Sequence, residues 1–256
     1  MPVHGSALKI RSTCLPALSA GGQVERIYSA EPCTDFHAPD AGLRVAADEE
    51  ALPFAGASFD LVVSALALHW VNDLPGTLLQ IRRVLKPDGL FIAAMAGGET
   101  LTELRQSLAA AEAEIEGGLS PRVAPFVEVR AMGSLLQRAG FALPVTDIDR
   151  LTVRYASLAG LFRDLRAMGA TNALAERHNK PLRRTTIARA AEIYAERFAD
   201  PDGRLRATFD LLWISAWAPH ESQQQPLKPG SARMRLADAL GAEERPAGEK
   251  ARPGED

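Results

Sequence analysis

Two acidic residues follow short apolar runs early in the chain and could together hold a nucleoside. Glu31 ends the run Val24–Ala30, and Asp48 follows the run Leu43–Ala46. A carboxylate in the place of Glu31 can accept two hydrogen bonds from the vicinal hydroxyls of a ribose. A carboxylate in the place of Asp48 can accept a hydrogen bond from an exocyclic amine, such as N6 of adenine. As isolated residues, both acids are also typical of solvated turns, so neither identifies a site alone.

Hydrophobic periodicity indicates the elements that would position these acids. Short apolar runs predict strands at Val24–Ala30, Leu43–Ala46, Phe59–Ser64 and Leu90–Ala94. Before the last of them, Asp73 can cap a helix, which the sequence Lys-Pro-Asp-Gly at 86–89 would stop. This alternation is typical of an α/β fold with a doubly wound, mostly parallel sheet covered by helices.

The second half of the chain predicts mainly helices. An apolar stripe begins at Leu101, a second helix ends at Gly140, and further helical patterns cover 157–168 and 182–198. Residues 141–155 read as extended structure. Thr208–Trp217 predicts a final strand, paired antiparallel at the edge of the sheet. We therefore expect a helical cap at about 99–200 inserted into the sheet domain.

Composition excludes several classes of protein. The 256 residues carry a formal net charge of -3, so bulk positive charge for nucleic-acid binding is absent. No apolar run approaches the roughly 20 residues of a membrane-spanning helix. The two cysteines, Cys14 and Cys33, have no metal-ligand spacing, so we expect no metal site and a reducing compartment. Residues 219–256 lack apolar runs and predict a disordered tail, in which one short patch at 233–240 could form a helix.

Between Asp48 and Met95 the chain resembles the class I S-adenosylmethionine-dependent methyltransferases. The resemblance is carried by the motifs LPF, SFDLVVS and RVLKPDGLFIAAM. HWVNDLPGTLLQ, GGETLTELRQSL and GGLSPRVAPFVEVRAMGSLLQRAGF resemble a narrower group. That group contains the methyltransferase-like assembly factors of respiratory complex I and is akin to the malonyl-carrier-protein methyltransferases of biotin synthesis. The resemblance covers roughly Gly22 to Pro219.

The resemblance implies S-adenosyl-L-methionine as cofactor and assigns roles to matching positions. Glu31 would bind the ribose hydroxyls, and Asp48 the adenine amine, with Ala47 and Glu49 in the same loop. The chain after the third predicted strand would pass the methionine end of the cofactor at Ser64, Ala65 and Leu66. His69 and Trp70 follow. His69 is a candidate general base or substrate-orienting group, although a lone histidine is more often packed, and Trp70 would form a wall of the substrate site.

One feature of the resembled family is missing. Its opening strand ends in a glycine-rich loop, D-x-G-x-G-x-G, through which backbone amides approach the cofactor. Upstream of Glu31 the chain has only Gly5 and Gly21-Gly22, so we expect 1–21 not to match the family and the first strand to be missing. The domain would then be 22–218. A truncated or mis-started sequence explains this, and so does divergence with loss of cofactor binding.

The reaction is left open between three functions. The first is an S-adenosylmethionine-dependent transferase that modifies a protein side chain, with a complex I subunit as partner. The second is a non-catalytic assembly or scaffold protein, so enzyme status is uncertain. The third is a carrier-protein carboxyl methyltransferase of the biotin-synthesis type. In the cap, Arg122 and Arg130 could hold an acidic partner, and solvated arginines are the plain alternative.

The expected location follows from the same reasoning. We expect a cytoplasmic protein if the chain is bacterial, or one on the matrix side of the mitochondrion if it is eukaryotic. Peripheral contact with a membrane is compatible with a respiratory partner.

Overall fold

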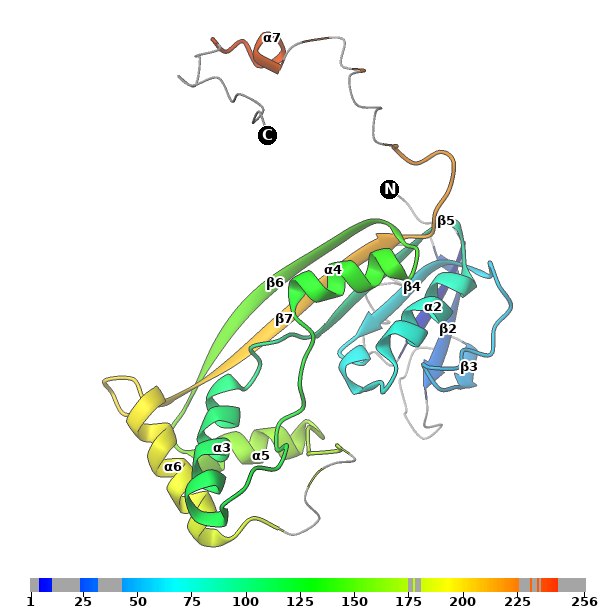
Figure 1. Ribbon diagram of the computed structural model, residues 1–256. Helices are drawn as coiled ribbons and strands as arrows, with labels where there is room; N and C mark the ends of the chain where they lie inside the picture. The colour runs from blue at the N-terminus through cyan, green and yellow to red at the C-terminus, as the bar shows by residue number, and fades with distance from the viewer. Residues whose placement is uncertain are drawn as a thin grey trace, which may run out of the picture. The chain divides into compact units, whose positions relative to one another are not determined.

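The computed structural model describes residues 5–10, 24–31, 43–174, 177, 181–225, 231, 234 and 236–243; for β1, Val24, Glu25, Glu31 and Leu236 the description is of the backbone. Seven strands form one sheet in the order β3-β2-β1-β4-β5-β7-β6 (Figure 1). Their bounds are β1 Gly5–Ile10, β2 Val24–Glu31, β3 Leu43–Ala46, β4 Phe59–Ala65, β5 Leu85–Ala96, β6 Ala142–Tyr155 and β7 Leu205–Trp217. The first five are parallel, and β7 is antiparallel to both of its neighbours. The predicted α/β class with a mostly parallel sheet is confirmed.

The opening strand is present, so the expectation that it is missing is wrong. β1 pairs in parallel with β2 on one side and with β4 on the other, in the middle of the sheet. It lies within the segment 1–21, which we expected not to match the family. The sequence hides it because its apolar residues are few and Lys9 interrupts them. A central strand is defined by backbone pairing on both edges, which no local pattern records.

The helix between β4 and β5 begins where its cap predicts. α2 spans Leu74–Val84, and the side chain of Asp73 accepts a hydrogen bond from the backbone N–H of Gly76. Strand β5 then starts at once, earlier than the predicted Leu90. The predicted turn 86–89 is retained as an irregularity within β5, because Leu85 pairs with Phe59 while Leu90 already pairs with Leu61.

The hairpin β6–β7 projects beyond the end of β5, its neighbour in the sheet. β5 pairs with β7 only over 211–217, whereas the described strand that pairs with residues 205–210 of β7 is β6. β7 was expected at the sheet edge, and this is wrong: β6 covers it and forms the edge. The reason is that the extended segment 141–155 folds back along β7 over its whole length.

Two separate hydrophobic cores result from this extension. Helices α2 and α4 (Val129–Arg138) pack on the sheet, with Leu78, Met132 and Ile214 among the buried residues. The second core joins α3 (Thr102–Glu116), α5 (Leu158–Ala167) and α6 (Arg184–Phe198) to the projecting end of β7 (Figure 1). These elements form the expected helical cap, with β6 passing through the same stretch of sequence.

Residues 1–221 form one compact unit and 222–256 a second. In the described part of the second unit, α7 spans Leu236–Leu240, which agrees with the helical patch expected there. Among the described residues, no helix is long and apolar enough to cross a lipid bilayer.

Candidate functional site

The carboxyl ends of the parallel strands lie level at one edge of the sheet. Ile10, the last residue of β1, pairs with Ala30 of β2 and with Ser64 of β4. Glu31, the last residue of β2, pairs with Ala46, the last residue of β3. The chain runs from β1 outward through β2 and β3 on one side and returns to β4 on the other. In open α/β sheets ligands bind at such a switch point, beyond the carboxyl ends of the strands.

Residues predicted to bind adenosine follow β2 and β3 at this edge. The backbone of Glu31 ends β2 beside Ala46, which places Glu31 and the loop of Asp48 on neighbouring strand ends. Asp48 is exposed, and its Oδ1 accepts a hydrogen bond from the backbone N–H of Glu50 at 2.9 Å. In the same loop Glu49 is buried, at 6% exposure, and Ala47 packs on the core of the sheet. Asp48 Oδ2 accepts no hydrogen bond from any residue that the structure describes, so it is available to a ligand.

The end of β4 carries an unsatisfied hydroxyl and a strained backbone. The side chain of Ser64 is buried at 1% exposure, and its Oγ has no hydrogen-bond partner in the described chain. After Ala65, Leu66 has a φ of 55°, in the left-handed region that favours glycine, and its side chain is 55% exposed. Its N–H donates to the carbonyl of Ala94 at 2.7 Å, which holds this conformation. Such strain is concentrated at functional sites.

The short helix η1, Leu68–Trp70, follows and carries the predicted substrate-side aromatic rings. The rings of His69 and Trp70 are 5.2 Å apart between centroids, and the ring of Phe126 lies 6.1 Å from that of His69. Phe126 belongs to the loop between α3 and α4. The structure therefore brings the loop that carries Arg122 to the turn after β4, and Phe126 is a neighbour of His69 that the sequence did not indicate.

The two arginines proposed for substrate binding differ in the structure. Arg122 forms an ion pair with Glu112 of α3 at 2.6 Å, and Glu112 is almost fully buried. The Glu112 carboxylate also accepts the backbone N–H of Ser120. Arg122 therefore anchors its own loop to the cap. Arg130 lies exposed near the start of α4 and makes no ion pair with any described residue.

Glu50 was not singled out from the sequence, yet it joins two loops at this edge. Its Oε1 accepts hydrogen bonds from the backbone N–H groups of Asn72 and Asp73, the latter at 3.2 Å. Arg83 of α2 makes a second connection, donating to the carbonyls of Leu52 and Phe54 at 2.8 and 2.7 Å. The only signal for Glu50 in the sequence is its place in the acidic run at 48–50.

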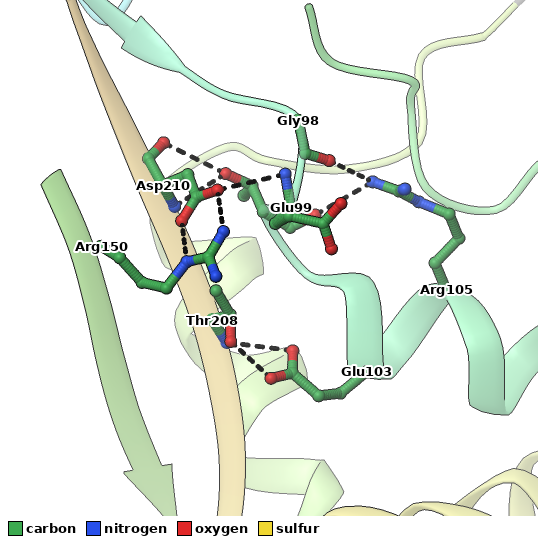
Figure 2. A network of polar contacts seen from close by, with 8 residues as sticks. Gly98, Glu99, Glu103, Arg105, Arg150, Thr208 and Asp210 are labelled. Carbon is green, nitrogen blue, oxygen red and sulfur yellow. Dashed lines mark hydrogen bonds and ion pairs between the residues drawn. The ribbon is translucent and has the colours of Figure 1, made fainter. Parts of the chain in front are cut away.

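A polar network holds the turn that follows β5, next to the same edge. Figure 2 shows Arg150 of β6 donating from Nε and Nη2 to the two carboxylate oxygens of Asp210, at 2.7 and 2.9 Å. Asp210 also accepts the backbone N–H of Glu99, and Arg105 donates to the carbonyl of Gly98 (Figure 2). The Asp210 side chain has 0% exposure, and its hydrogen bond raises the pKa of Arg150 above its ordinary value.

On the opposite side of this turn, α3 is tied to the same strand. Glu103 accepts both the backbone N–H and the hydroxyl of Thr208 (Figure 2). The network thus connects sheet and cap through β7. Within the described ranges, no group of three or more His, Cys, Asp or Glu side chains is arranged to hold a metal ion.

Comparisons relate the chain to known proteins. Residues 19–93 match the model of a family described as a methyltransferase domain. The mitochondrial arginine-hydroxylase NDUFAF5 of Danio rerio is 50% identical over 194 residues, which are 76% of this chain and 60% of that protein. The malonyl-[acyl-carrier protein] O-methyltransferase of Laribacter hongkongensis is 37% identical over 209 residues, which are 82% of this chain and 64% of that protein. The chain spans less than two thirds of either relative.

Among solved structures, the YcgJ protein of Bacillus subtilis matches with a TM-score of 0.57. The match covers 85% of this chain and 93% of that chain at 13% identity. At this identity the likeness concerns the fold alone.

Proposed function

We propose that the chain belongs to the methyltransferase-like group of its relatives and binds S-adenosyl-L-methionine at the carboxyl edge of β1–β4. Glu31 holds the ribose hydroxyls and Asp48 the adenine amine, with Ala47 and Glu49 beside it. Ser64, Ala65 and Leu66 line the methionine end. The observation that carries this proposal is the register: β1, β2, β3 and β4 end at Ile10, Glu31, Ala46 and Ala65, which lie within one residue of the same level.

The residues of this edge fit such a ligand. The Ser64 hydroxyl is buried and has no hydrogen-bond partner among the described residues, which costs free energy unless a ligand accepts or donates a hydrogen bond there. Asp48 Oδ2 is available on an exposed carboxylate, and β1 provides the central strand whose end the cofactor must face. The residues that would correspond to the glycine-rich loop, 11–23, lie outside the described residues.

S-adenosyl-L-methionine supplies an activated methyl group on a sulfonium, so the protein mainly has to align the acceptor and hold a proton. His69 is the candidate group to take up that proton, because a neutral imidazole nitrogen can act as a general base. Trp70 and Phe126 flank His69 and would exclude water from the acceptor. Arg130 remains a candidate contact for an acidic partner. Arg122 is paired with Glu112, so its role is to hold the loop in position rather than to contact the substrate.

For the acceptor we propose a side chain of a protein in the assembly of respiratory complex I. Support comes from the higher identity to the arginine-hydroxylase NDUFAF5, 50%, than to the malonyl-[acyl-carrier protein] O-methyltransferase, 37%. The location would follow the partner: cytoplasmic in a bacterium, or the matrix side in a eukaryote, with peripheral membrane contact through the partner.

Cofactor binding is tested by titration calorimetry with S-adenosyl-L-methionine and its demethylated product. We expect Asp48→Ala to weaken binding by about 1–3 kcal/mol, or roughly 5- to 150-fold, because a charged acceptor is lost. Asp202→Ala is the matched control. The Asp202 side chain also accepts a hydrogen bond from the backbone N–H two residues later, that of Arg204, at 3.0 Å, but it lies in the loop between α6 and β7. Absence of heat with the unmodified chain at millimolar ligand would defeat the proposal.

The reaction is tested on the candidate acceptors themselves. A respiratory subunit and an acyl carrier protein, each incubated with protein and cofactor, are examined by mass spectrometry. A gain of one methylene mass indicates methyl transfer, and a gain of one oxygen indicates hydroxylation. Co-purification of the subunit that is unaffected by Glu31→Ala and Asp48→Ala, without any mass change, would favour the scaffold function.

A further inference from the structure

The Glu50 side chain connects the loop after β3 to the turn after β4. Its backbone N–H donates to Asp48 Oδ1, and its own Oε1 accepts from Asn72 and Asp73. These partners are 22 and 23 residues away in sequence. A continuous series of hydrogen bonds therefore runs from the carboxylate proposed to hold adenine to the segment that follows His69 and Trp70.

These contacts require a side-chain oxygen that accepts hydrogen bonds. Asn72 and Asp73 directly precede α2, where backbone N–H groups have no partner within the helix and the helix dipole is positive. One charged oxygen can accept both N–H groups. Asp73 already uses its own carboxylate on Gly76, so it cannot replace Glu50.

The remainder of the loop is fixed independently of Glu50. Arg83 donates to the carbonyls of Leu52 and Phe54, and Phe54 packs edge-to-face on Phe59, with ring centroids 5.0 Å apart. Loss of Glu50 would therefore release the turn after β4 and the first residues of the loop, while the Leu52–Phe54 segment stays in place.

We infer that Glu50 is a positioning residue, which sets the placement of the His69–Trp70 turn relative to Asp48. The expected effect on ligand binding rests on the proposed function. The hydrogen-bonded connection itself is independent of that function. When a ligand occupies Asp48, the connection transmits that occupancy to the turn after β4. Adenosyl binding and the arrangement of the acceptor side are thereby coupled.

The test measures amide hydrogen exchange over 66–74 and the affinity for S-adenosylhomocysteine in the intact chain. In Glu50→Ala we expect exchange at Asn72 and Asp73 to rise about tenfold or more, and affinity to fall about 5- to 20-fold. Glu50→Gln, whose amide oxygen still accepts, should lie close to the unmodified protein. Glu192→Ala, an exposed glutamate of α6, is the control for loss of charge.

One readout separates positioning from simple stabilisation. S-adenosylhomocysteine should protect 66–74 from exchange in the unmodified chain and in Glu50→Gln, but not in Glu50→Ala. Unchanged exchange in the free Glu50→Ala protein overturns the inference, and so does full protection by ligand in that variant. If the unmodified chain binds no ligand, the proposed function fails while the exchange of the free proteins still tests the connection. Should Glu50→Ala not fold, Glu50→Asp, one methylene shorter, replaces it.

Discussion

The ion pair between Arg150 and Asp210 predicts an unequal response to the loss of either partner. The Asp210 side chain has 0% exposure, whereas that of Arg150 is 57% exposed. Arg150→Met leaves a buried carboxylate whose remaining side-chain hydrogen bond is the N–H of Glu99. Asp210→Asn instead leaves a guanidinium that water can solvate. The first variant should therefore be the more destabilising.

The magnitudes follow from burial. Removing one partner of a buried pair costs about 3–5 kcal/mol, and the exposure of Arg150 reduces this to roughly 2–3 kcal/mol. Asp210→Asn should cost about 1 kcal/mol, near that of an ordinary hydrogen bond. With a urea m-value of about 2–3 kcal/mol/M, Arg150→Met shifts the unfolding midpoint by roughly 1 M.

The assay is equilibrium urea unfolding followed by circular dichroism. Arg154→Met is the matched control, because Arg154 pairs with Asp200, whose side chain is 19% exposed, so its loss should be smaller. The double variant Arg150→Met with Asp210→Asn should recover part of the loss, since no charge is then buried. A larger loss for Asp210→Asn than for Arg150→Met would refute the reasoning.

Two further predictions concern the cap. Burial raises the pKa of Tyr194, whose hydroxyl donates to the carbonyl of Arg206 at 2.7 Å, so stability should fall as pH rises above about 10, the value in the unfolded chain. Tyr194→Phe should reduce this slope in urea midpoints measured between pH 8 and 11; an unchanged slope would contradict the assignment. Arg122→Met leaves buried Glu112 unpaired, and we expect a loss of about 3 kcal/mol together with faster hydrogen exchange over 120–126. If hydrogen exchange over 120–126 is no faster in Arg122→Met than in the unmodified protein, the ion pair does not hold the loop.

Local patterns in the sequence sufficed wherever a structure is defined by neighbouring residues. The strand Leu43–Ala46 and the cap of α2 at Asp73 lie where the pattern predicts them. The stripe of Leu101, Leu104 and Leu108 is buried in the cap, with exposures of 8, 3 and 4%. Helical periodicity and capping are properties of short segments, so they can be read without knowledge of the partner surfaces.

The order of the strands in the sheet was harder to predict from the sequence. β1 was missed, and β7 was expected at the edge although β6 covers it. Both depend on which strands pair, and a parallel or long-range pair has no fixed spacing in the sequence. The motifs around Asp48 and Ser64 nevertheless indicated residues that the structure brings to one edge of the sheet, because parallel strands present their carboxyl ends on the same side.

From its sequence alone this protein is an α/β chain with acids after its first two predicted strands and with a helical cap. Only the tertiary structure decided that Glu50 reaches Asn72 and Asp73, that Asp210 receives Arg150 from 60 residues away, and that Arg122 is committed to Glu112. A side-chain carboxylate can satisfy many donors, and the donor that it meets depends on strand register and on helix packing. Those are set by the burial of whole faces, which no short stretch of sequence contains.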